Sequence, residues 1–138
     1  LTQSAIISLH CDLNHFTSPV IDEAALNSVK PGCVLINTAG GELVDTRALL
    51  EAIGQQRISG YGADVYQGER DIFQRKFDSL DKIDDPTLVS LITHPGVLLT
   101  PHLGFLTMEA MHQVARTVIN EITYFENLTG GPADRLMI

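Results

Sequence analysis

The side chains best suited to chemistry stand just after four short apolar runs of the sequence. Glu69 and His102 are the most informative of them, because an imidazole titrates at about pH 6.5 and a carboxylate beside it fixes its tautomer and stabilises the imidazolium. Such a pair would act as a general acid and base at neutral pH. The residues that follow the runs are His10, Cys11, Asp12, Thr38, Ala39, Gly40, Gly41, Asp64, Glu69, Pro101 and His102.

Taken singly, these residues also fit ordinary structural roles. An Asp or Glu after a strand often caps a helix or stays solvated, and His102 could be a turn residue only. The interpretation therefore depends on whether the elements that carry these residues bring them together.

Apolar runs that alternate with amphipathic segments indicate the elements that position the candidates. The runs predict β-strands over residues 5–10, 33–37, 58–65 and 97–100. Between them, Asp22 is a plausible N-cap for a helix through Val29, and Asp45 caps a helix over residues 46–54. The second run, CVLIN, is apolar on both faces, which favours a parallel sheet over a hairpin.

Strands alternating with helices predict an α/β fold with right-handed crossovers, a doubly wound parallel sheet with helices on both faces. In such a sheet the ligand crevice lies beyond the carboxyl ends of the strands, where the candidate residues stand. Residues 66–96 are the longest irregular stretch, with a possible short helix over 88–92. From Thr107 we expect a long C-terminal helix that is apolar along one face and is ended by Gly130, Gly131 and Pro132.

Composition excludes several classes of function. The 138 residues are 44% hydrophobic with a net charge of -8, so the chain can form its own core and would repel nucleic acid and anionic membrane surfaces. Its apolar runs fall far short of a membrane span. Cys11 and Cys33 lack CxxC spacing, which indicates reduced thiols in a cytoplasmic protein. The spacing of the His and Cys residues favours no metal site.

Four blocks of the sequence resemble the D-isomer-specific 2-hydroxyacid dehydrogenases, most closely their D-lactate dehydrogenase branch. The blocks are AIISLHCDLN, VLINTAGGELVDTRALLEAI, GADVYQGE and LLTPHLGFLTMEA, in the family's order. The long link between YQGERDIF and His102 favours the D-lactate branch. The resemblance implies that residues 1–138 are the second half of a Rossmann-like coenzyme domain, truncated, with residues 107–127 as the returning helix and with the substrate domain absent.

The resemblance also implies a reaction, the NAD-dependent transfer of a hydride between a small D-2-hydroxy acid and nicotinamide, with the matching 2-keto acid on the other side. His102 would be the acid and base on the substrate oxygen, and Glu69 would hold and polarise it. The residues implied to line the coenzyme are His10, Cys11, Asp12, Thr17, Thr38, Ala39, Gly40 and Asp64.

Two departures from the family pattern bear on activity. Gly40 stands where the family has an Arg that grips the substrate carboxylate, and Arg47 in the next helix is a poor substitute for it. No GxGxxG loop follows a strand, so the usual anchor for the coenzyme pyrophosphate is missing from these residues. We therefore expect the chain alone to be inactive.

Two hypotheses for function remain open. In the first, the chain is part of a D-lactate type dehydrogenase that forms a homodimer. In the second, it is a non-catalytic half-domain that associates with itself or with a partner, because a truncated sheet leaves an edge strand and an apolar face uncovered.

Overall fold

The computed structural model describes residues 1–73 and 75–129. The chain forms two compact units, Leu1–Leu103 and Gly104–Ile138. The helix end that the sequence predicts at Gly130, Gly131 and Pro132 lies outside the described residues.

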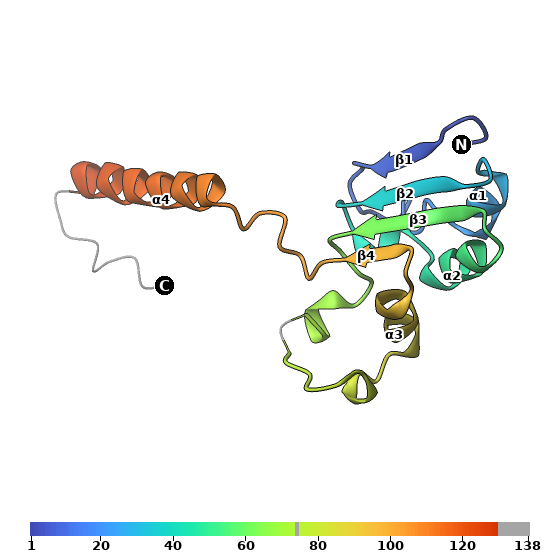
Figure 1. Ribbon diagram of the computed structural model, residues 1–138. Helices are drawn as coiled ribbons and strands as arrows, with labels where there is room; N and C mark the ends of the chain where they lie inside the picture. The colour runs from blue at the N-terminus through green and yellow to red at the C-terminus, as the bar shows by residue number, and fades with distance from the viewer. Residues whose placement is uncertain (74, 130–138) are drawn as a thin grey trace. The chain divides into compact units, whose positions relative to one another are not determined.

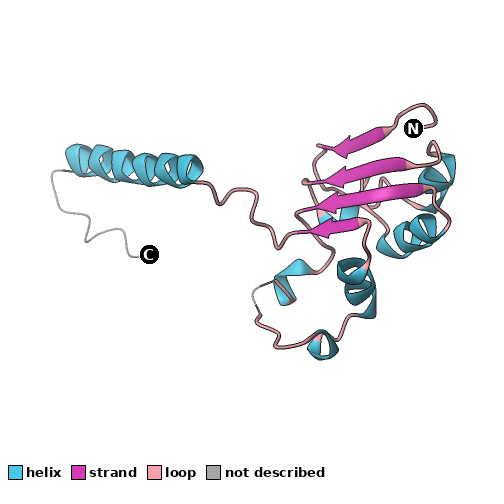
Figure 2. Ribbon diagram, in the orientation of Figure 1, coloured by secondary structure: helices cyan, strands magenta, loops and turns pink. Residues whose placement is uncertain are grey.

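A four-stranded parallel sheet forms the centre of the first unit (Figures 1 and 2). In their spatial order the strands are β1 (Ile6–Leu9), β2 (Cys33–Asn37), β3 (Ile58–Ala63) and β4 (Val97–Leu99). The last residues of neighbouring strands are register partners, since Leu9 pairs with Asn37, Asn37 with Ala63, and Ala63 with Leu99. The four strands therefore finish level at one edge, where the candidate residues begin. The predicted α/β fold with a parallel sheet is confirmed.

Three α-helices, each begun by an aspartate, connect the strands. They are α1 (Glu23–Ser28), α2 (Thr46–Gly54) and α3 (Pro86–Thr93). The Asp22, Asp45 and Asp85 carboxylates accept hydrogen bonds from first-turn N–H groups that have no partner inside the helix. The first two caps were predicted. The third explains why α3 begins at Pro86 and not at residue 88, because Pro suits the first position of a helix.

Between the strands, the described residues form three short 3₁₀ helices. They are η1 (Gly41–Leu43), η2 (Glu69–Asp71) and η3 (Leu80–Lys82). The first follows β2 directly, and the other two lie in the stretch after β3 that the sequence predicts to be irregular. Glu69 therefore belongs to a short local turn and to no regular element of the sheet.

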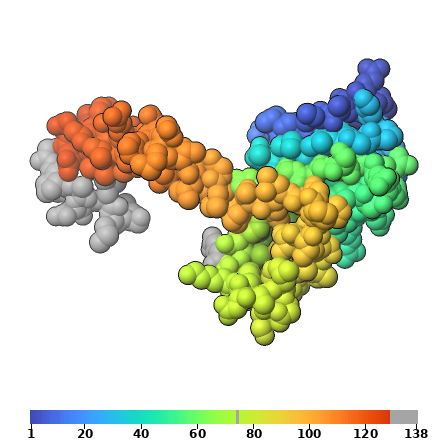
Figure 3. Space-filling view, in the orientation of Figure 1, coloured from blue at the N-terminus to red at the C-terminus, as the bar shows by residue number. Residues whose placement is uncertain are grey.

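Within Leu1–Leu103 the helices α1, α2 and α3 cover one face of the sheet, and the other face is open in this unit. Leu35 and Tyr61 on the covered face are buried, whereas Ile6 and Leu98 on the other face are 67% and 70% exposed. The cause is topological. Right-handed crossovers between strands that are added in one direction all fall on the same side, and a second layer needs a reversal of strand order, which the order β1-β2-β3-β4 lacks. Figure 3 shows this open face, with β1 and β2 at the surface.

The second unit contains α4 (Met108–Thr129), the long helix that the sequence predicts. The Thr107 hydroxyl accepts a hydrogen bond from the Ala110 N–H at 3.1 Å, so this residue begins the helix as expected. Within this unit the predicted apolar stripe is exposed from Met108 to Ile122, with Val114 at 56% and Ile119 at 62%. Among the described residues, no helix combines the length and the hydrophobicity that crossing a bilayer would require.

Candidate active site

Glu69 and His102 lie in contact at the carboxyl edge of the sheet. His102 Nδ1 and Glu69 Oε1 are 2.6 Å apart, although the residues are 33 positions apart in the chain. The His102 side chain is 55% exposed and that of Glu69 is 22% exposed. The carboxylate is therefore sheltered behind an imidazole that faces solvent.

The turn after β3 presents Glu69 to the imidazole. Gly68 adopts φ +76°, a left-handed conformation that favours glycine, and so reverses the chain just before Glu69. The Tyr66 N–H donates to Glu69 Oε2 at 2.8 Å, and the Glu69 N–H donates to the Tyr66 carbonyl at 3.1 Å. One carboxylate oxygen is thus held by the backbone of Tyr66 and the other is left for His102.

The loop after β4 holds His102 in an uncommon backbone conformation. Its φ of +55° lies in the left-handed region, which costs a non-glycine residue about 1 kcal/mol or more. The Asp64 carboxylate supports this loop on both sides of the histidine, because it accepts hydrogen bonds from the Thr100 hydroxyl and from the Leu103 N–H, the latter at 2.8 Å. Asp64 is therefore a clamp for the loop that presents His102.

The geometry of the pair determines which imidazole nitrogen is available for chemistry. An ionised carboxylate can only accept, so His102 Nδ1 must carry the hydrogen of the bond to Glu69. In the neutral ring, Nε2 then holds a lone pair. The exposed Nε2 can take a proton from a bound molecule and return it, while Glu69 stabilises the cationic ring.

The turn after β2 is shaped by the fully buried Asn37. Its Oδ1 accepts from the Ala39 N–H at 3.1 Å and its Nδ2 donates to the Gly40 carbonyl at 2.8 Å. Burial raises the pKa of Tyr61, which also hydrogen bonds to Asn37, to about 12. Thr38 and Ala39 are exposed beyond this turn, at the same edge of the sheet as the acid and base pair.

The loop after β1 carries four of the predicted coenzyme residues. His10, Cys11 and Asp12 are exposed, and His10 Nε2 lies 2.8 Å from the Ser8 hydroxyl. The Thr17 hydroxyl donates to the Asp12 carbonyl at 2.7 Å, so Thr17 folds this loop back on itself. These residues line the edge at the end of β1, and their contact with a coenzyme stays a prediction.

Gly40 and Gly41 differ in what a side chain would meet. At Gly40 a Cβ would lie 3.4 Å from the nearest atom, a Leu13 side-chain carbon, and φ is -153°. At Gly41 it would lie 2.2 Å from the backbone carbon of Tyr66. Gly40 can therefore accept a side chain, whereas Gly41 is needed for the close approach of η1 to the Tyr66 backbone.

We expect Gly41→Ala to destabilise the protein by about 3 kcal/mol, because its methyl group must displace the backbone of the turn that carries Glu69. Urea denaturation followed by circular dichroism measures this loss. Gly54→Ala is the matched control, since its Cβ would meet no atom within 4 Å and alanine favours the helical backbone there. Equal denaturation midpoints for the two variants would contradict the assigned contact.

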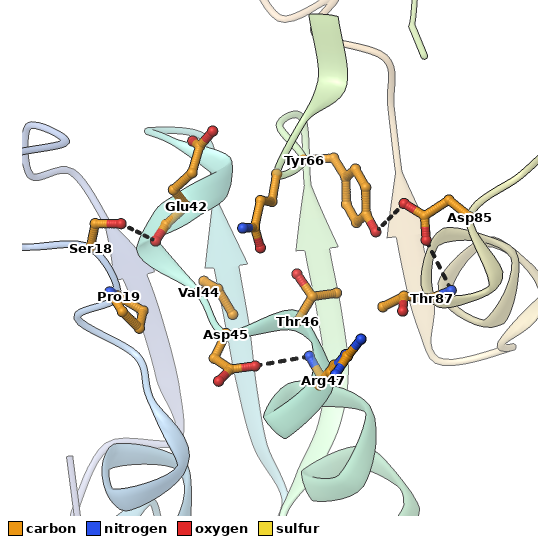
Figure 4. A pocket seen from close by; sticks show the side chains of 11 residues that line it. Ser18, Pro19, Glu42, Val44, Asp45, Thr46, Arg47, Tyr66, Asp85 and Thr87 are labelled. Carbon is orange, nitrogen blue, oxygen red and sulfur yellow. Dashed lines mark hydrogen bonds between the residues drawn. The ribbon is translucent and has the colours of Figure 1, made fainter. Parts of the chain in front are cut away.

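A pocket that the sequence did not predict lies beside the turn at Tyr66. It has a volume of about 390 Å³ and is lined by Ser18, Pro19, Glu42, Val44, Asp45, Thr46, Arg47, Tyr66, Gln67, Asp85 and Thr87 (Figure 4). Glu69 and His102 are not among these residues. Arg47, the only cationic residue in this lining, thus lines a pocket to which the acid and base pair does not belong.

Metal ligands do not gather at the site. Within residues 1–73 and 75–129, no group of three His, Cys, Asp or Glu side chains is arranged to hold a metal ion. Cys11 and Cys33 are free thiols, and burial raises the pKa of Cys33.

Comparison with known proteins relates this architecture to a family. Residues 1–104 match the family described as D-isomer specific 2-hydroxyacid dehydrogenase, NAD binding domain. The 2-hydroxyacid dehydrogenase homolog 1 of Schizosaccharomyces pombe is 38% identical over 133 residues, which are 96% of this chain and 40% of that protein. The D-lactate dehydrogenase of Escherichia coli is 37% identical over 125 residues, 91% of this chain and 38% of that protein.

A solved structure agrees with the sequence comparison. The D-lactate dehydrogenase of Lactobacillus jensenii, crystallised with NAD+, superposes with a TM-score of 0.79 at 31% identity, covering 100% of this chain and 40% of that one. The chain thus spans about two fifths of the length of the relatives that it matches.

Proposed function

The chain belongs to the D-isomer specific 2-hydroxyacid dehydrogenases through their NAD-binding domain, and we propose that it supplies the acid and base pair of an NAD-dependent enzyme of the D-lactate type. The complete enzyme would interconvert a small 2-keto acid and its D-2-hydroxy acid. The observation that carries the proposal is the 2.6 Å contact between His102 Nδ1 and Glu69 Oε1 at the carboxyl edge of a parallel sheet.

His102 would move the proton of this reaction. Its exposed Nε2 would donate to the substrate carbonyl oxygen during reduction and would accept the hydroxyl proton during oxidation. Glu69 would keep Nδ1 protonated and offset the positive charge of the ring, so that Nε2 remains the only nitrogen that faces the substrate.

The strand ends fit one half of the coenzyme better than the other. Thr38 and Ala39 are exposed and Gly40 is half-buried on the edge that also carries His102, which suits a nicotinamide ring and its ribose. A bound coenzyme would supply or accept the hydride. The described residues offer no GxGxxG turn between a strand and a helix for the pyrophosphate, so that end of the coenzyme lacks its usual anchor in these residues.

Two further features belong to the proposal, a cytoplasmic location and a homodimer. Free thiols at the exposed Cys11 and the buried Cys33 suit the reducing cytoplasm. A homodimer would cover part of the open face of the sheet, where Ile6 and Leu98 are exposed.

The first test is a titration of the chain with coenzyme fragments. We expect NADH to bind with a Kd in the millimolar range, about 4 kcal/mol, because only the nicotinamide end finds partners. In ¹H–¹⁵N spectra, NADH and reduced nicotinamide mononucleotide should both shift the amides of residues 38–40 and 102–103. AMP should shift neither group, and no NADH-dependent reduction of pyruvate should be detected.

The opposite pattern would refute this assignment. Shifts caused by AMP alone would place the adenosine end of the coenzyme on these residues. Measurable turnover by the chain alone would show that the reaction needs neither a pyrophosphate-binding loop nor an arginine at position 40 for the substrate carboxylate. Shifts by NADH at residues away from the carboxyl edge would separate the acid and base pair from the coenzyme.

A self-associating module is the second candidate, and the exposed side chains of the open sheet face and of α4 favour it. Light scattering after size exclusion separates the two. A stable dimer that binds neither NADH nor reduced nicotinamide mononucleotide would support the module. Family membership alone fits either outcome, so the coenzyme titration decides between them.

A further inference from the structure

Tyr66 holds the oxygen of the Glu69 carboxylate that does not meet His102. Two hydrogen bonds join the residues, one from the Tyr66 N–H to Glu69 Oε2 and one from the Glu69 N–H to the Tyr66 carbonyl. Gln67 and Gly68 between them are exposed. The Glu69 carbonyl accepts from the Ile72 and Phe73 N–H groups, which fixes the backbone of the turn. The direction of the carboxylate that meets His102 therefore depends on how firmly Tyr66 is held.

Tyr66 is held at its far end by the cap of α3. Its hydroxyl donates to Asp85 Oδ2 at 2.8 Å, and Asp85 Oδ1 accepts from the Thr87 N–H (Figure 4). Asp85 Oδ1 also accepts from the Leu88 N–H. This one side-chain bond joins residues 19 positions apart. The bond joins the start of the long connection between β3 and α3, in which Glu69 lies, to the end of that connection.

The state of the hydroxyl supports its role as a fixed donor. Tyr66 is 7% exposed, and burial, followed by the hydrogen bond to Asp85 and its negative charge, raises the pKa of Tyr66 far above its ordinary value. Tyr66 thus stays protonated across the neutral range. A hydrogen bond to a charged acceptor is worth about 1.5 to 3 kcal/mol, enough to bias a surface turn.

We propose that Tyr66 is a positioning residue for the acid and base pair: anchored on Asp85, it orients the Glu69 carboxylate so that His102 keeps its proton on Nδ1. The inference rests on the proposed function for its catalytic meaning, although the arrangement itself can be measured without coenzyme or substrate. The irregular connection between β3 and α3 would then have a role, because it carries Glu69 near one end and Asp85, the anchor of Tyr66, at the other.

The test is the tautomer of His102 in the intact chain, read from ¹⁵N shifts of the imidazole nitrogens at alkaline pH. In the unaltered protein we expect the Nδ1–H form to dominate, because Glu69 accepts from it. Tyr66→Phe removes the hydroxyl alone and should lower the ratio of Nδ1–H to Nε2–H at least about threefold, a part of the energy of the lost bond. His10, His15, His94 and His112 serve as internal references.

A matched control separates positioning from general loss of stability. Tyr61→Phe removes the hydroxyl of a similarly buried tyrosine that bonds to Asn37, whereas the Tyr66 hydroxyl bonds to Asp85. We expect this variant to be destabilised while the His102 tautomer ratio is unchanged. The same change of ratio in both variants would overturn the proposal, as would an unchanged ratio in Tyr66→Phe.

A second variant removes the same bond from the other side. Asp85→Ser keeps one oxygen to cap α3 but lacks the second oxygen that accepts from Tyr66. It should shift the ratio in the same direction as Tyr66→Phe, and it decides the question alone if Tyr66→Phe does not fold. The tautomer measurement uses no coenzyme, so an unchanged ratio would overturn the role of Tyr66 without bearing on the proposed reaction. Failure of NADH to bind would bear on the proposed reaction without changing the tautomer result.

Discussion

Gly40→Arg is expected to raise kcat/KM for pyruvate by about a thousandfold in a chimera in which this chain replaces the matched 125-residue segment of Escherichia coli D-lactate dehydrogenase. The chimera supplies the parts of the enzyme that lie outside the matched segment. The resemblance places an arginine at this position, where a planar guanidinium can form two parallel hydrogen bonds with the substrate carboxylate. A glycine can form none.

The local structure leaves room for this change. The backbone at Gly40 is extended, with φ -153°, which any residue adopts, and the nearest neighbour of a Cβ would be a Leu13 side-chain carbon at 3.4 Å. The following Gly41 would not tolerate a side chain, so the gain is specific to one of two adjacent glycines. Pyruvate-dependent oxidation of NADH, followed by absorbance, measures the effect.

Gly40→Lys is the control that isolates geometry from charge. It restores a cation at the same position but cannot form the paired hydrogen bonds, so it should recover only a small part of the gain. Equal rates for the lysine and arginine variants would show that charge alone was missing. No gain from either would show that the site obtains its clamp elsewhere, for example from Arg47. Gly40→Arg in the chain alone should give no activity, because the pyrophosphate anchor is still absent.

The sequence predicted the elements that carry the site and the partners within it. Residues 33–37 and 46–54 form the predicted strand and helix, and Glu69 meets His102 as expected. Both predictions hold because each strand ends where its apolar run ends. The parallel register then places the strand ends at one edge of the sheet, so the residues that follow them lie close together. The one-sided layer of residues 1–103 could not be predicted, because which face a helix covers depends on the order of strands in space, and the apolar pattern of a single strand does not record it.

The supports of the site could not be predicted from spacing. Asp64 was expected near a nicotinamide, and the structure shows its carboxylate on the loop of residues 100–103. Tyr66 and Asp85 carried no signal as a pair, because 19 residues of irregular chain separate them. Asp85 followed by Pro86 is a sequence signal for the start of α3, and it would have identified Asp85, the residue that anchors Tyr66, as a helix cap.

The largest loss is expected from His102→Gln in the Gly40→Arg chimera, which should lower kcat by about three to four orders of magnitude and leave the Kd for NADH within about twofold. Glutamine keeps a polar side chain of similar reach but cannot take up and return a proton at neutral pH. Stopped-flow measurement of a single turnover separates the chemical step from product release.

Glu69→Gln should cost less, about ten- to a hundredfold in kcat, because its amide still approaches Nδ1 but cannot offset the charge of the imidazolium. The double variant His102→Gln with Glu69→Gln should be no slower than His102→Gln alone. Such non-additivity is required if Glu69 acts only through His102, since a residue that works through another has nothing to contribute once that other is gone. If the two losses instead multiply, Glu69 has a contact with substrate or coenzyme of its own, and the contact at 2.6 Å would not be the source of its effect.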